Sequence, residues 1–164
     1  MTKPIYIITA VMSGKYVSYF IEILAVIFLL LSLYPIMRYG TLAGVQVPQH
    51  FSKGCVDIWT TRVIFIYIAL IGIVIYALLS FCQVHPNMIN IPFDSKISVQ
   101  DKALMATSLA RFLKLWCMAM FAFLSISFYR IAIGKEQCLN NFILYIILLS
   151  SIIHLCLILF LRDR

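Results

Sequence analysis

Two ionisable residues interrupt long apolar runs of this sequence. Glu22 is the one charged residue of the run 16–37, and His154 lies within the uncharged run 141–161. An ionisable side chain inside a membrane is costly, so it often marks a functional contact. If both runs span a bilayer, the two residues lie about 9–10 Å inside the same boundary. We therefore expect Glu22 and His154 to face the interior of a helical bundle as a polar pair.

A second arrangement of these two residues is compatible with the same spacing. Glu22 would then lie at the level of the lipid headgroups and pair with Lys114 or Arg111. His154 would bond to a neighbouring serine or to the backbone. The sequence leaves both arrangements open.

The segment 38–62 holds the most specific pattern of the chain. A proline precedes a histidine and a phenylalanine, and a glycine, an aspartate, a tryptophan and an arginine follow at short intervals. These residues are Pro48, His50, Phe51, Gly54, Asp57, Trp59 and Arg62. We expect the set to be mainly structural, and we take it as the candidate site for a ligand or partner.

Physical roles can be assigned to five members of that set. Gly54 suits a position with positive φ. Asp57 and Arg62 could pair across the turn, and Trp59 could anchor the segment at the lipid interface. His50 could be a ligand, a proton donor or a hydrogen-bonded turn residue.

Neither a metal site nor an active site is expected. A metal needs more ligands than His50, Asp57 and Cys55 supply, and no cofactor motif is present. An enzyme needs an acid, a base and a nucleophile at one depth, which His50 and Asp57 cannot provide alone. We therefore expect no catalytic residues and no enzymatic activity.

Two cysteines outside the apolar runs, Cys55 and Cys138, fall on the same side of the predicted topology. We expect two unrelated free thiols. A disulfide is the alternative, because the outer side of a bacterial envelope permits one.

The composition identifies the class of protein. Of 164 residues, 63% are hydrophobic and 12% are charged, against roughly 45–50% and about 25% in a soluble domain. This excludes a soluble monomer, a disordered segment and a coiled coil. The net charge of +7 is expected to orient the chain against anionic lipid, with no nucleic acid as partner.

Four apolar runs are long enough to cross a bilayer: residues 16–37, 63–81, 109–133 and 141–161. Backbone groups inside a membrane must be paired within their own segment, so each run is a helix. We predict an all-α, integral membrane four-helix bundle that forms one domain over residues 1–164. The outer loop 38–62 should be compact and irregular. In the loop 82–108, a capping box at Ser98–Asp101 predicts that the third helix begins near Val99.

The basic residues give the orientation. Of the 13 Lys and Arg, eight fall on the side of the two termini and five on the other. Because basic residues collect on the cytoplasmic side, we expect both termini and the loop 82–108 in the cytoplasm.

The pattern from Pro48 to Arg62 resembles an uncharacterised bacterial membrane domain that also forms the start of SdpI-like immunity proteins. Residues 89–92, Ile-Asn-Ile-Pro, and residues 106–114 are similar to the segment after the second helix of four-helix members. The resemblance implies a binding or accessory protein of the bacterial inner membrane, acting in toxin immunity or in signalling. Its outer loop would then meet a peptide or protein partner. The alternative is a small transporter or channel subunit, which would have to act as an oligomer.

Overall fold

The computed structural model describes residues 15–89 and 98–162, with residues 154–155 and 157–162 described by their backbone alone. The elements follow one another as α2 (Lys15–Ser32), α3 (Tyr34–Met37), η1 (Tyr39–Leu42), β1 (Val47–Ser52), β2 (Cys55–Thr60), α4 (Ile64–Val84), η2 (Pro86–Met88), α5 (Val99–Ala132) and α6 (Asn141–Arg162).

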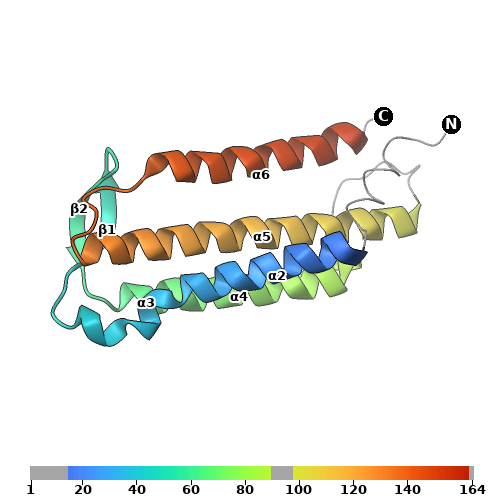
Figure 1. The fold of residues 1–164 in the computed structure, drawn as a ribbon. Coiled ribbons are helices and arrows are strands. Elements are labelled where there is room, and N and C mark those ends of the chain that lie inside the picture. The colour runs from blue at the N-terminus through green and yellow to red at the C-terminus, as the bar shows by residue number, and fades with distance from the viewer. Residues whose placement is uncertain (1–14, 90–97, 163–164) are drawn as a thin grey trace.

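The long helices run side by side, and α5 lies at the centre (Figure 1). Helices α2 and α4 pack against one side of α5, and α6 lies along the opposite side. The two strands form a hairpin at one end of the bundle, here called the hairpin end. The start of α2 and the end of α6 lie at the other, here called the terminal end.

Three of the described helices, α2, α4 and α5, are long and apolar enough to cross a membrane, which supports a membrane protein. Helix α5 has 34 residues and a length of about 51 Å, against about 30 Å for the hydrocarbon core of a bilayer. It begins at Val99, where the Ser98 hydroxyl accepts a hydrogen bond from the backbone N–H of Asp101 at 3.1 Å. The predicted start of this helix is therefore confirmed.

The predicted all-α four-helix bundle is correct only in part. The segment 38–62 is not an irregular loop, because it contains an antiparallel two-stranded sheet. Gly54 was expected to break regular structure, but with Lys53 it forms the tight turn that lets the two strands pair. Helix α6 has 22 residues, but its described apolar part, Asn141–Ile153, is too short to count as a further span.

The first predicted helix, 16–37, is also divided. Helix α2 ends at Ser32, and the single turn α3 follows with Pro35 in its first positions. Proline has no N–H with which to bond the preceding turn, so a continuous helix is interrupted there.

Small residues bring the three central helices together. Ser32, Ala69, Gly72 and Ser125 are buried, and the Ser125 hydroxyl donates a hydrogen bond of 2.7 Å to the backbone carbonyl of Ser32. Close approach of this kind is how apolar helices associate without a hydrophobic driving force. The middle of the bundle is therefore packed.

The hairpin end has a core of its own. Leu42, Val47 and Phe65 are fully buried against each other, and Phe128 and Tyr129 of α5 pack on them. This core joins η1, β1, α4 and α5. The hairpin is therefore packed onto the helices.

Candidate functional site

The hairpin has a tight turn and two irregular positions. Lys53 and Gly54, at the turn, have φ values of 51° and 87°, as a two-residue hairpin turn requires. The positive φ predicted for Gly54 is thus confirmed. Pairing runs from Val47↔Thr60 to Ser52↔Cys55, with register shifts on either side of His50.

The shift between His50 and Phe51 leaves Asp57 as an extra residue of β2 beside His50. A bulge of this kind redirects the side chain next to it. The Nδ1 atom of His50 lies 2.8 Å and 3.0 Å from the two carboxylate oxygens of Asp57. The two side chains are 62% and 40% exposed, so the pair is open to solvent.

Arg62 does not pair with Asp57, and that expectation was wrong. Its guanidinium donates a hydrogen bond of 2.9 Å to the backbone carbonyl of Tyr39 and lies 4.2 Å from the centre of the Tyr39 ring. The bulge turns Asp57 towards His50, and Arg62 instead connects the start of α4 to η1.

The hairpin is fastened to the connection between α5 and α6. A disulfide joins Cys55 to Cys138, and the backbone N–H of Leu139 donates a 2.7 Å hydrogen bond to the carbonyl of Gly54. The expectation of two free thiols was therefore wrong, and the alternative holds. Sequence alone could not bring these residues together, because 83 positions separate them.

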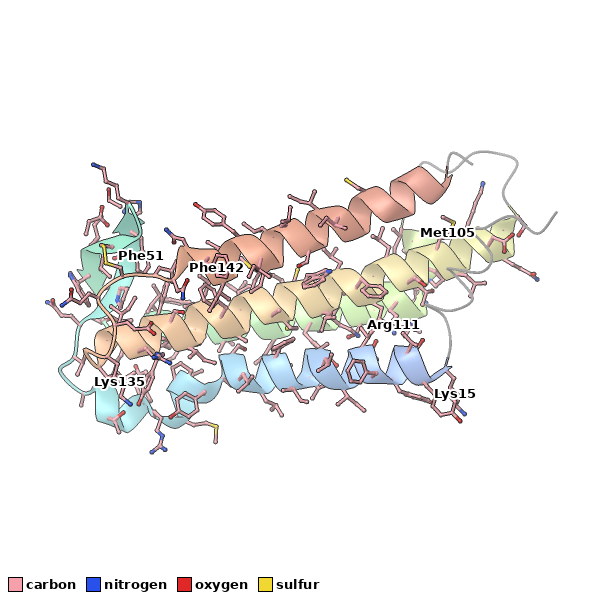
Figure 2. All side chains as sticks on the ribbon, turned by 45° about the horizontal axis from the view of Figure 1, so that its top comes forward. Lys15, Phe51, Met105, Arg111, Lys135 and Phe142 are labelled. Carbon is pink, nitrogen blue, oxygen red and sulfur yellow. A yellow bond between two sulfur atoms is a disulfide. The ribbon has the colours of Figure 1, made fainter. Side chains whose placement is uncertain are left out.

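Aromatic packing fixes the hairpin from its other side. The rings of Phe51 and Phe128 lie 5.1 Å apart, centre to centre, and Figure 2 shows Phe51 at the hairpin end. Pro48 is buried opposite Trp59 in the sheet. Phe51 and Pro48 are thus packing residues, whereas Trp59 is 44% exposed.

A groove lies at the base of the hairpin, with a volume of about 560 Å³. It combines aliphatic, hydroxyl, amide and guanidinium groups with one aromatic ring. Its lining residues are Leu42, Gly44, Val45, Gln46, Trp59, Thr60, Thr61 and Arg62. Only Trp59 and Arg62 belong to the predicted set. The other lining residues carry no signal in the sequence, because the fold of η1 onto β2 decides their position.

No family model, curated protein or solved structure matches the chain. Within the described ranges, no three His, Cys, Asp or Glu side chains are grouped so that they could hold a metal ion.

A second polar site lies between the helices near the terminal end. The carboxylate of Glu22 lies 2.7 Å from the Lys114 ammonium and 3.5 Å from Nε of Arg111. Lys114 also donates hydrogen bonds to Gln83 Oε1 at 2.8 Å and to Ser80 Oγ at 3.2 Å. We call Ser18, Glu22, Ser80, Gln83, Arg111 and Lys114 the charged cluster.

The charged cluster has the arrangement that was the alternative for Glu22. The side chain of His154 lies outside the described residues, so its predicted pairing with Glu22 stays a prediction. Helix α5 lies between α2, which contains Glu22, and α6, which contains His154, in both views (Figures 1 and 2). The sequence had named Lys114 and Arg111 as alternative partners of Glu22, but it did not identify Ser80 and Gln83. These two are three residues apart, which places them on one helix face.

Proposed function

We propose that the chain is an integral membrane binding protein that recognises a ligand or protein partner at its hairpin end. The observation that carries the proposal is the groove between η1 and β2, beside a hairpin held on two sides. A binding surface needs its contacts positioned before the partner arrives, because ordering them on binding costs affinity. The disulfide and the Phe51–Phe128 packing hold the hairpin in place before a partner binds.

The groups in the groove suit recognition. Arg62 is held in place by Tyr39, and a fixed guanidinium is suited to carboxylates and to polar backbone groups. Trp59 offers a partly exposed ring of the type that often dominates binding energy. Thr60 and Thr61 add hydroxyls that can donate and accept hydrogen bonds.

We further propose that the hairpin end lies outside the cytoplasm and that the terminal end lies inside. A stable disulfide belongs to an oxidising compartment, which supports an outer position for Cys55 and Cys138. The excess of basic residues near the termini supports the same orientation. Helix α6 has 22 residues in all, which is enough to cross a bilayer. We propose it as a fourth crossing, so that both termini lie in the cytoplasm of a bacterial cell.

Within this proposal, the resemblance to SdpI-like proteins favours immunity to a peptide toxin or signalling by capture of a partner. The transporter or channel alternative receives less support. The middle of the described bundle is closed by contacts such as Ser125 to Ser32, so a pathway would have to form between copies of the chain, as this alternative requires.

Site-specific photocrosslinking in native membranes tests the proposal. A photoreactive residue replaces Thr61 or Gln46, both in the groove, and Lys135 serves as the control position because it is exposed at the same end. We expect the same adduct from both groove positions, none from position 135, and loss of the adduct with Arg62→Gln. Equal adducts from all three positions, or none from the groove, would contradict it.

The proposed role in toxin immunity has its own test. A strain that lacks the protein should become sensitive to one member of a panel of secreted peptide toxins. Restoring the wild-type chain should restore resistance, whereas Trp59→Ala at equal membrane abundance should not. Unchanged sensitivity across the panel would count against immunity but would leave the crosslinking result standing.

A further inference from the structure

The charged cluster contains two cations and one carboxylate. Within it, Lys114 is 2% exposed, and its three ammonium hydrogens have three acceptors: Glu22 Oε2, Gln83 Oε1 and Ser80 Oγ. The charge of Lys114 is therefore neutralised, and its hydrogen-bonding capacity is used within the protein.

The carboxylate of Glu22 makes a longer contact with Arg111 than with Lys114, at 3.5 Å against 2.7 Å. Nη1 of Arg111 donates a 2.9 Å hydrogen bond to the hydroxyl of Ser18, which is neutral. Its Nε is buried 3.5 Å from Glu22 Oε1, and neither atom has a hydrogen-bond partner among the described residues. Glu22 already balances Lys114, so the cluster keeps one surplus positive charge.

A surplus charge is costly in an apolar setting unless an anion compensates it. Asp57 forms an ion pair with His50, and Glu136 forms one with Arg130. Both pairs lie at the hairpin end. Asp101 caps the start of α5 through Ser98. Across the described ranges, Glu22 is the one carboxylate in a salt bridge with Arg111.

The cluster reaches the side of the bundle at a defined depth. The side chains of Arg111 and Glu22 are 13% and 27% exposed, and Figure 2 shows Arg111 between α5 and α2, towards the end where Lys15 lies. Gln83 belongs to the last turn of α4, which ends at Val84. Glu22 comes about 10 Å after the start of α2. The cluster therefore lies where α4 ends, whereas α2 and α5 continue beyond it towards the terminal end.

Exposed residues close to Glu22 along α2 are apolar or aromatic, and the Lys15 ammonium lies 6.0 Å from the ring centre of Tyr19. Tyr19 and Ile23, which flank Glu22 in α2, are 57% and 58% exposed. Such a surface is suited to acyl chains, so the anion that reaches Arg111 would come from the bilayer. Guanidinium groups bind phosphate oxygens through paired, charge-assisted hydrogen bonds.

We propose that Arg111, beside the Glu22–Lys114 pair, binds the phosphate of an anionic phospholipid headgroup in the leaflet at the terminal end. One surplus charge matches a headgroup of net charge −1, such as phosphatidylglycerol, better than a zwitterionic one. This site lies at the opposite end from the groove, so it does not depend on the proposed function.

The test measures lipid binding to the purified full-length protein. Delipidated protein in a neutral detergent is titrated with phosphatidylglycerol or phosphatidylcholine, and bound lipid is counted by native mass spectrometry. We expect one phosphatidylglycerol to bind about tenfold or more tightly than phosphatidylcholine, as one charge-assisted contact allows. Arg111→Gln should remove this preference. Lys102→Gln is the control, because Lys102 lies on the same helix about 13 Å away and should leave the preference unchanged.

Glu22→Gln separates a lipid site from a purely structural ion pair. It removes the carboxylate that competes for Arg111, so binding of phosphatidylglycerol should tighten. If Arg111→Gln does not fold, judged by its circular dichroism, the Glu22→Gln result decides. Equal affinity of the wild type for both lipids, a preference that survives Arg111→Gln, or weaker binding by folded Glu22→Gln would overturn the proposal. Displacement of the lipid by millimolar inorganic phosphate would assign the site to a soluble anion and overturn the lipid assignment.

Discussion

Lys114 of α5 and Glu22 of α2 form an ion pair with 2.7 Å between Nζ and Oε2, and the Lys114 side chain is 2% exposed. The contact joins two helices at the level where α4 ends, and Gln83 of α4 completes it. The Lys114 ammonium therefore connects three helices, because it contacts Glu22 of α2 as well as Gln83 and Ser80 of α4.

Removal of Glu22 should cost more than removal of Lys114. Glu22→Gln leaves Arg111 and Lys114 without a counter-charge, and breaking a buried pair in this way costs about 3–5 kcal/mol. Lys114→Met keeps the length of the side chain and leaves Glu22 paired with Arg111, so we expect a loss of about 1–2 kcal/mol. Thermal unfolding in detergent compares the two. The reverse order would mean that Arg111 does not take over the carboxylate.

The helices could be predicted from composition and spacing, because each helix depends on properties of its own segment. The apolar runs and the Ser98 cap identify α4 and α5 within a few residues of their ends. The start of the third helix is an example, since the Ser98 hydroxyl accepts a hydrogen bond from the backbone N–H of Asp101 without any tertiary contact.

The contacts of the candidate sites were harder to predict because they join distant segments. Cys138 meets Cys55 only after α4 and α5 have crossed and returned. The pairing of Asp57 with His50, in place of Arg62, depends on a bulge whose position the sequence does not specify. Glu22 had several possible partners, and the rotation of α2 against α5 selects among them.

The His50–Asp57 pair should contribute little to stability. Both side chains are substantially exposed, and exposed pairs are worth about 0.2–1 kcal/mol. His50→Ala and Asp57→Ala should each lower the free energy of unfolding by no more than that. Phe51→Ala serves as a comparison and should cost about 2–3 kcal/mol, because its ring packs on Phe128. If His50→Ala abolishes crosslinking at the groove with stability unchanged, the pair belongs to the binding surface.

The disulfide should be present in the native protein and should stabilise it. In intact cells, a membrane-impermeant maleimide should label Cys55 and Cys138 only after reduction. The double variant Cys55→Ser/Cys138→Ser should lose about 2–4 kcal/mol. Cys117→Ser, which removes a free thiol, is the control for serine substitution. Labelling of both cysteines without reductant would exclude the bridge.

Three glycines allow the backbone and the packing contributions to be separated. Gly54 has φ +87°, and a Cβ there would lie 2.9 Å from Nδ2 of Asn141. Gly134 has φ +74° with open space around it, whereas Gly40 has open space and no positive φ. An alanine at positive φ costs about 1–2 kcal/mol. We therefore expect Gly40→Ala to be neutral and Gly134→Ala to show the backbone cost alone.

Gly54→Ala should lower the free energy of unfolding more than Gly134→Ala does, because Asn141 at the start of α6 must also move. The difference between these two losses of stability measures how firmly α6 is held against the hairpin. It should shrink when Asn141 is itself replaced by alanine, since the obstructing amide is then gone. Thermal unfolding of Gly54→Ala, Asn141→Ala and the double variant gives this coupling directly. Strictly additive losses would mean that the side chain of Asn141 moves aside at no cost, and that the disulfide and the Leu139–Gly54 hydrogen bond alone connect the hairpin to the loop before α6.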